Sequence, residues 1–180
     1  MHEKTTRSKT LYQGQVVTLR LDTVTAPDGK ESTREIVVRS DCVAIVPVDE
    51  KGNILLVRQY RHAIQKELLE IPAGSIEPGE KVEDAVRREM QEETGFLPQK
   101  LVKLGGFYAS PGYCTEYLYL YLVTDLVPSR LFAEDTDEIS LVRTPVKEIP
   151  ALLASGQICD SKSVAGLYLY LNHCSVSEIT

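Results

Sequence analysis

The chain has 180 residues, of which 43% are hydrophobic and 26% charged, and this size suits one compact domain with a small extension. A formal net charge of -6 argues against nucleic acid or an anionic membrane as the main partner, because an acidic surface attracts neither. The first ten residues are polar and charged, and no apolar run reaches the length of a membrane span, so we expect a cytoplasmic protein.

The first part of the chain carries the pattern of a β-hairpin. Apolar and polar residues alternate over 16–24, a turn signal follows at 26–30, and a second extended run covers 34–39. We expect residues 1–40 to form a small antiparallel sheet that precedes a main domain at 41–180. A two-stranded hairpin is marginal by itself, so it needs a partner surface from its own domain or from a second subunit.

The main domain begins with two apolar strands, expected at 42–48 and 54–60 around a turn at 49–53. Tyrosine and leucine alternate from Glu116 to Leu122, which predicts a strand packed on both faces, with burial in a dimer as the alternative role for the tyrosines.

Helices are expected at 146–154 and 161–172, the second capped by Asp160 or Ser161. A further helix starts after the turn at Pro78 and Gly79 and ends near Gly95. These elements together predict the α/β class, as a sandwich with a mixed sheet and helices on both sides.

Three glutamates in this helix, Glu89, Glu92 and Glu93, occupy positions that folding alone does not favour. A helix advances about 100° per residue, so Glu89 and Glu93 continue the apolar face that the preceding turns begin, with Val82, Ala85, Val86 and Met90. We therefore expect the trio of glutamates to point toward the core side. Like charges at i,i+4 repel, anions near a helix C-terminus oppose the macrodipole, and burial of a carboxylate is costly. A hard divalent cation such as Mg²⁺ would reverse all three penalties.

Other charges of the same helix follow the pattern of a solvent-exposed surface. Glu83 with Arg87, and Asp84 with Arg88, place an acid four residues before a base, which modestly supports an exposed helix. Arg88 therefore has two interpretations of equal weight, as a partner of Asp84 or as a group that orients Glu92 or another of the glutamates.

The stretch from Gly74 to Phe96, GSIEPGEKVEDAVRREMQEETGF, resembles the Nudix box at every fixed position. The resemblance implies hydrolysis of a nucleoside diphosphate linked to another moiety, with Mg²⁺ or Mn²⁺ held by the box glutamates. We expect Glu89 and Glu93 to ligate metal directly, and Glu92 to share a second ion or to act in the first water shell of the metal. Ala73 is expected to ligate the metal through its backbone carbonyl oxygen.

A second motif, from Tyr108 to Glu116, is similar to the signature of the ADP-ribose pyrophosphatase branch, with Pro111 sixteen residues after Gly95. Members of that branch carry an N-terminal strand domain used for dimerisation, so the resemblance implies a homodimer. It also implies that Glu116 orients or deprotonates the attacking water, the alternative being an exposed acid at a strand edge.

The resemblance implies that Arg61, Glu70 and Ser110 contact the substrate, and that Arg61 binds its diphosphate. Three functions compete as interpretations of the chain. The first is hydrolysis of ADP-ribose or a related ADP-sugar to AMP and ribose 5-phosphate, and the second is hydrolysis of GDP-mannose or another nucleoside diphosphate sugar. The third is a catalytically silent protein that senses a nucleotide, although a sensor does not need the full set of glutamates.

Overall fold

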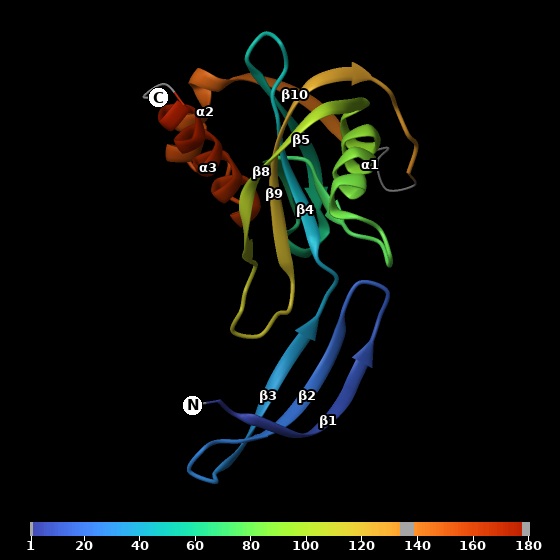
Figure 1. Ribbon diagram of the computed structural model, residues 1–180, viewed down its shortest axis with the longest axis vertical. Helices are drawn as coiled ribbons and strands as arrows, with labels where there is room; N and C mark the ends of the chain where they lie inside the picture. Colours follow the sequence, from blue (N-terminus) through green and yellow to red (C-terminus); the bar gives the residue numbers. More distant parts are fainter. Residues whose placement is uncertain (1, 134–138, 178–180) are drawn as a thin grey trace. The chain divides into compact units, whose positions relative to one another are not determined.

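A computed structural model describes residues 2–133 and 139–177 of the chain (Figure 1). The chain folds into two compact units. The first unit comprises residues 1–41 and 107–117, and the second comprises residues 42–106 and 118–180.

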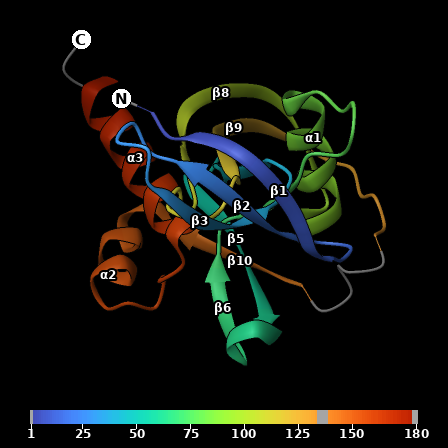
Figure 2. The same cartoon turned by 90° about the horizontal axis from the view of Figure 1, so that it is seen from below.

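The first unit is built on a three-stranded antiparallel sheet in the order β1-β2-β3 (Figure 2). The expected hairpin is confirmed as β2 (Thr18–Thr25) and β3 (Glu31–Val38). A further strand, β1 (Lys4–Gln13), pairs with β2 and is exposed at every one of its 10 residues. Residues 107–117 add to this unit through backbone hydrogen bonds to β3, from Val37 N to the Tyr113 oxygen (2.7 Å) and from Thr115 N to the Val37 oxygen (3.0 Å).

The second unit contains two sheets. One has the order β7-β4-β9-β8, with β4 (Cys42–Pro47) parallel to β9 (Tyr117–Pro128) and antiparallel to β7 (Ala73–Ser75). β8 (Phe96–Tyr108) is its edge strand. The other sheet has the order β10-β5-β6, formed by Ser140–Pro145, Asn53–Arg61 and Lys66–Glu70. The expected strands after residue 41 are thus confirmed, and β4 is buried along its whole length because both of its faces are covered.

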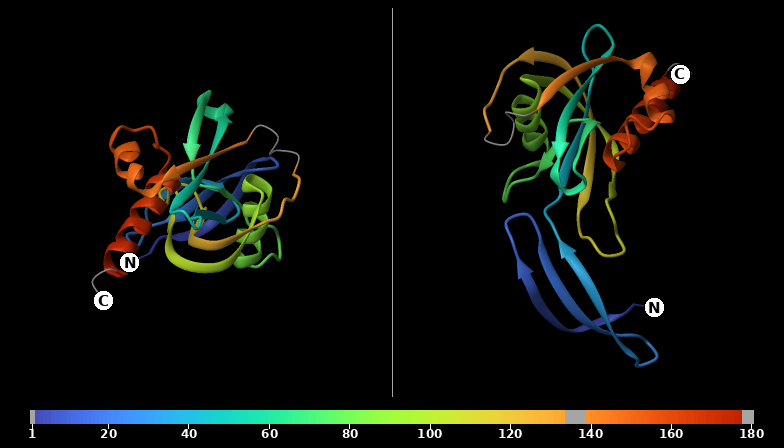
Figure 3. Two further views of the ribbon diagram at one scale, coloured as in Figure 1. Left: turned by 90° about the horizontal axis from the view of Figure 1, so that it is seen from above. Right: turned by 180° about the vertical axis from the view of Figure 1, so that it is seen from behind.

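Helices lie on both sides of these sheets, as Figures 1 and 3 show. α1 (Val82–Thr94) contacts β4 on one side, and α3 (Ser161–Ser177) contacts β4 on the other. The short helices η1 (His62–Ile64), η2 (Val146–Glu148) and α2 (Ile149–Ala154) connect strands or precede α3. The predicted α/β sandwich is therefore confirmed. Among the described residues, no helix is both long enough and apolar enough to cross a membrane.

Local sequence signals determine where the long helices begin and end. Gly95 adopts φ 77°, the left-handed conformation that glycine allows, and its N–H bonds back to the Gln91 oxygen to close α1. Asp160 caps α3 through its Oδ1 atom, which accepts a hydrogen bond of 3.1 Å from Ser163 N. β9 packs as predicted for its tyrosines, since Tyr121 belongs to the core cluster and Tyr119 packs against it.

Candidate active site

α1 carries two carboxylates on its buried face. Glu89 and Glu93 are only 8% and 7% exposed, and they lie beside the fully buried Ala85, Val86 and Met90. Their inward orientation agrees with the helical spacing. Glu92 differs from the expectation of an inward trio, because the helix turns it to the margin of this face, where it is half-buried.

Burial makes the charges on these two carboxylates unfavourable. Desolvation and the neighbouring charge of Glu89 raise the pKa of Glu93 to about 8, and only one hydrogen bond, 3.1 Å from Ala73 N, favours its charged form. Desolvation also raises the pKa of Glu89, although the adjacent Arg88 opposes the shift. The site thus contains an acidic pair that a nearby cation would stabilise.

Gly74 makes room for one of these carboxylates. A Cβ atom on Gly74 would lie 2.0 Å from the Cδ and Oε1 atoms of Glu89. Any side chain at this first position of the box would therefore displace the Glu89 carboxylate from its place against β7.

Arg88 links the carboxylates at the edge of the site. Its Nη1 donates to Glu89 Oε1 (2.6 Å) and Glu92 Oε2 (3.0 Å), while Nε and Nη2 donate to the two oxygens of Glu80 (2.9 and 3.0 Å). Nη2 also donates to the Ser75 carbonyl oxygen at 2.9 Å. This fork of donors suits a guanidinium and holds several acceptors in fixed positions.

The alternative pairing expected for Arg88 is not the one that forms. Asp84 Oδ1 lies 3.5 Å from Nη1 of Arg87, three residues later on the helix. The Arg87 side chain also donates to the Glu83 backbone oxygen. Arg88 instead faces Glu80, because the turn at Gly79 brings that glutamate back over the first turn of the helix. The role of Glu80 was not anticipated, although the residue is one of the fixed positions of the box.

A second polar cluster lies at the ends of β5 and β6. Arg61 donates to both oxygens of Glu70 (2.8 and 2.5 Å), and Lys162 of α3 donates to the same carboxylate. Burial opposes the ionisation of Glu70, whose side chain is 1% exposed, but these hydrogen bonds outweigh burial and lower its pKa. Lys162 also donates to Asp160 Oδ1 at 2.8 Å.

The two clusters lie close enough for their charges to interact. Glu93 and Asp160 both raise the pKa of Arg61, although the hydrogen bond to Glu70 is the largest cause. Lys162 and Arg61 in turn oppose the raised pKa of Glu93. The structure therefore brings the box carboxylates together with Arg61 and Glu70, and it adds Lys162, which sequence spacing could not indicate because it lies 92 residues from Glu70.

The two remaining predicted residues, Ser110 and Glu116, belong to the first unit. Glu116 Oε1 lies 3.2 Å from Arg39 Nη1, with its side chain 13% exposed. The Ser110 carbonyl oxygen accepts hydrogen bonds from Tyr113 N (3.2 Å) and Cys114 N (2.8 Å), so Ser110 opens a tight turn.

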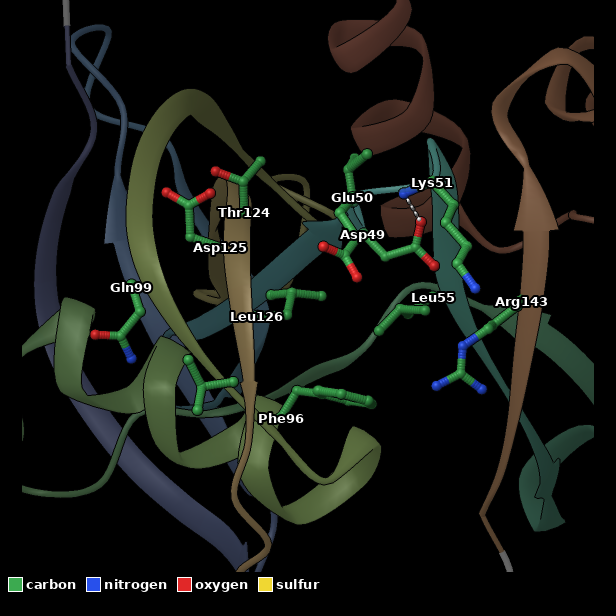
Figure 4. A pocket seen from close by; sticks show the side chains of 12 residues that line it. Asp49, Glu50, Lys51, Leu55, Phe96, Gln99, Thr124, Asp125, Leu126 and Arg143 are labelled. Carbon is green, nitrogen blue, oxygen red and sulfur yellow. Dashed lines mark hydrogen bonds between the residues drawn. The ribbon is translucent and has the colours of Figure 1, made fainter.

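A cavity of about 540 Å³ in the second unit has none of these residues in its lining. Figure 4 shows its lining, with the Arg143 guanidinium 5.7 Å from the Phe96 ring centroid and Leu55 beside them. No residue predicted for the site lines this cavity, so charge and burial, not hollow volume, locate the candidate active site.

No three His, Cys, Asp or Glu side chains of the described residues converge on one point suited to a metal ion. Within the box, Arg88 holds Glu92 and one oxygen of Glu89 in salt bridges of 3.0 and 2.6 Å. Glu89 and Glu93 are the two carboxylates that the helix buries side by side on one face.

The chain belongs to the Nudix family, since the model of the NUDIX domain matches residues 38–165. The model of the nucleoside diphosphate sugar hydrolase N-terminal domain matches residues 3–37. The predicted resemblance to this family is thereby confirmed, and the chain is a Nudix hydrolase.

Relatives of similar length support this assignment. The chain is 32% identical to the ADP-ribose pyrophosphatase of Bacillus subtilis (strain 168), with 95% of this chain and 94% of the relative covered. It is 36% identical to the methanol dehydrogenase activator of Bacillus methanolicus, with 94% and 93% covered. A crystal structure of an ADP compounds hydrolase shares the fold, with a TM-score of 0.90 at 23% identity over 98% of this chain and 96% of that one.

Proposed function

We propose that this protein hydrolyses the diphosphate of ADP-ribose or a related ADP-sugar to AMP and ribose 5-phosphate or the corresponding sugar phosphate. The observation that carries the proposal is the buried pair of Glu89 and Glu93 within electrostatic reach of Arg61. The names of the Bacillus subtilis relative and of the N-terminal family model support the same substrate class.

The chemistry of the carboxylates fits a divalent cation, Mg²⁺ or Mn²⁺. Both buried glutamates have raised pKa values, mainly because burial disfavours their charged forms, and Gly74 leaves space for the Glu89 carboxylate. A bound cation would offset this cost of burying the charges. Glu89 and Glu93 would hold it with the Ala73 carbonyl, and Glu92 would take a second ion or its water shell. When bound, such an ion neutralises diphosphate charge and lowers the pKa of a coordinated water.

The other residues of the proposed site are assigned to binding the substrate and to positioning the carboxylates and the water. Arg61 uses Nε and Nη2 on Glu70, while Nη1 makes no hydrogen bond within the described residues, and 40% of the side chain is exposed. We assign this free edge of the guanidinium, with Glu70 fixing its orientation, to the substrate diphosphate. Arg88 is assigned to the positioning of Glu89 and Glu92, Glu116 to the orientation of water, and Ser110 to substrate contact.

A substrate panel tests this proposal. ADP-ribose, GDP-mannose and diadenosine polyphosphates are incubated with the protein and Mg²⁺, and release of AMP or GMP is measured with and without EDTA. We expect ADP-ribose to be hydrolysed with the highest kcat/KM, and EDTA to abolish turnover. A preference for GDP-mannose would reassign the substrate, and tight ADP-ribose binding without turnover of any compound would identify a nucleotide sensor.

We further propose that residues 1–40 form a dimerisation domain. The β1-β2-β3 sheet buries few apolar side chains of its own, while Leu11, Tyr12 and Val16 are 47%, 60% and 66% exposed. A second copy of the chain would cover these side chains. Deletion of residues 1–40 is expected to yield a monomer or an aggregate by light scattering, whereas a well-behaved active monomer would contradict the proposal. A cytoplasmic location stays a prediction.

A further inference from the structure

Two buried side-chain atoms lack hydrogen-bond partners within the described part of the chain, Asp160 Oδ2 and Gln59 Nε2. One is an acceptor and the other is a donor. Buried polar atoms in folded proteins are almost always paired, because an unpaired one loses its hydration without compensation. Each atom therefore lacks a partner that a bound water or a ligand would supply.

Both residues border the polar cluster of Arg61 and Glu70. The other oxygen of Asp160 is already used, since Oδ1 accepts from Lys162 Nζ (2.8 Å) and Ser163 N (3.1 Å). The charge of Asp160 contributes to the raised pKa of Arg61, which places the carboxylate near the guanidinium. Gln59 lies two residues before Arg61 on β5, and side chains two apart on a strand point to the same face.

The arrangement selects a ligand by its hydrogen-bonding capacity. A carboxylate oxygen can only accept, and the Nε2 amide group and the guanidinium can only donate. A hydroxyl group does both, so it can donate to Asp160 while another oxygen of the same molecule accepts from Gln59 or Arg61. An acceptor-only group, such as the fully ionised diphosphate of an ADP-sugar, would satisfy the donors and leave Asp160 unpaired.

We propose that Asp160 and Gln59 bind hydroxyl groups of the sugar attached to the substrate diphosphate. This inference rests on the proposed hydrolysis of a nucleoside diphosphate sugar. It identifies the residues of the site that recognise the sugar. Asp160 Oδ2 and Gln59 Nε2 are themselves covered by protein, so a sugar hydroxyl reaches them only when these side chains turn outward. The side chains of Asp160 and Arg61, which are 15% and 40% exposed, border solvent on this side. Asp160 is then a substrate-binding residue supplied by the N-terminus of α3.

The variant Asp160→Asn tests this role, because the amide keeps one oxygen for the cap of α3 and replaces the second oxygen by a donor. Two substrates are compared, ADP-ribose and the methyl ester of ADP, which has the same diphosphate and no sugar beyond it. We expect kcat/KM for ADP-ribose to fall about tenfold or more through KM, and that for the methyl ester to change by less than about twofold. Gln59→Met is expected to show the same selective loss.

The matched control is Asp49→Asn, the same change at an aspartate that caps the turn between β4 and β5. Asp49 Oδ1 accepts from Lys51 N (2.9 Å) and Asn53 N (2.8 Å), and its other oxygen is also paired. The substrate ratio of this variant should equal that of the wild type. If Asp160→Asn does not fold, Asp160→Ser retains a capping hydroxyl, lacks the second oxygen, and is subject to the same comparison.

The outcomes separate this inference from the proposed function. Wild-type protein that hydrolyses neither compound would overturn the proposed function itself. Wild-type turnover with an unchanged substrate ratio in the Asp160 variants would overturn the inference alone and assign the Oδ2 partner to a bound water. An equal loss with both substrates would likewise overturn it, because it would show that Asp160 acts by holding Lys162 and α3.

Discussion

The carboxylate of Glu89 lies against Gly74, at a distance that leaves no room for a β-carbon between the two residues. This contact relates the first glycine of the box to a buried glutamate fifteen positions later in the sequence. A side chain at position 74 is therefore expected to change the geometry of the site more than the stability of the fold, because the group that must move is the end of the flexible Glu89 side chain.

Gly74→Ala is expected to lower kcat/KM by about tenfold to a hundredfold, because it displaces a proposed metal ligand. The melting temperature should change little, since the clash at 2.0 Å involves the Glu89 carboxylate and not backbone. Activity with Mg²⁺ and thermal unfolding without metal are the two measurements.

Gly156→Ala is the matched control for this substitution. Gly156 has φ +75° and open space around it, so the alanine strains the backbone there by about 1 kcal/mol and touches no site residue. We expect lower stability with unchanged activity, the reverse of Gly74→Ala. Full activity of Gly74→Ala would show that the position of the Glu89 carboxylate is unimportant.

Much of this local geometry could be predicted from the sequence, because a helix repeats regularly. The spacing of Ala85, Glu89 and Glu93 is sufficient to place the two glutamates on the buried face, and Gly95 marks the end of the helix. β1 could not be predicted in this way. All ten of its residues are exposed, so no alternation of apolar and polar residues indicates a strand.

The contacts of Glu70 could not be predicted either. Its partner Lys162 lies 92 residues away, and neither residue belongs to a pattern that relates the two. The resemblance to a family indicated Arg61 and Glu70 as substrate contacts, but their mutual salt bridge arises from the antiparallel register of β5 and β6. Contacts between distant segments depend on the packing of α3, which spacing along the chain does not encode.

Glu93→Gln is expected to reduce activity by orders of magnitude and to leave the metal-free fold as stable or more stable. Folding raises the pKa of Glu93 from 4.5 to about 8, so the folded chain binds this proton more tightly than the unfolded chain does. The resulting stability is present at low pH and is lost as the pH rises through about 8, by up to a few kcal/mol. Urea unfolding in EDTA between pH 5 and 9 should therefore show a weaker pH dependence in the variant.

Asp84→Asn provides the control on the same helix, because the Asp84 side chain is 61% exposed. Its activity and its pH dependence of unfolding should match the wild type. Activity retained by Glu93→Gln would remove this residue from the proposed metal site, and an unchanged pH dependence would show that its carboxyl is not the group that titrates.

Arg88→Lys tests whether the forked contacts of Arg88 matter beyond its charge. An ammonium cannot reproduce the simultaneous hydrogen bonds to Glu80, Glu89 and Glu92. We expect kcat to fall about tenfold to a hundredfold and the free energy of unfolding to fall by about 1–3 kcal/mol. Arg87→Lys, in a single exposed salt bridge of 3.5 Å, should change neither quantity measurably. Equal behaviour of the two variants would show that Arg88 is an ordinary surface charge.

Lys162→Met is expected to lower the free energy of unfolding at pH 7 by about 3 kcal/mol, because it removes one of the two cations bound to the buried Glu70. Folding lowers the pKa of Glu70, despite the opposing effect of its burial, so the contribution of this ion cluster is present above pH 4.5 and is lost as the pH falls through the folded-state pKa. The difference between variant and wild type should therefore shrink in acid. The double variant Glu70→Gln with Lys162→Met should recover part of the lost stability at pH 7, because no uncompensated carboxylate remains buried. A double variant no more stable than Lys162→Met would show instead that Lys162 stabilises α3 independently of Glu70.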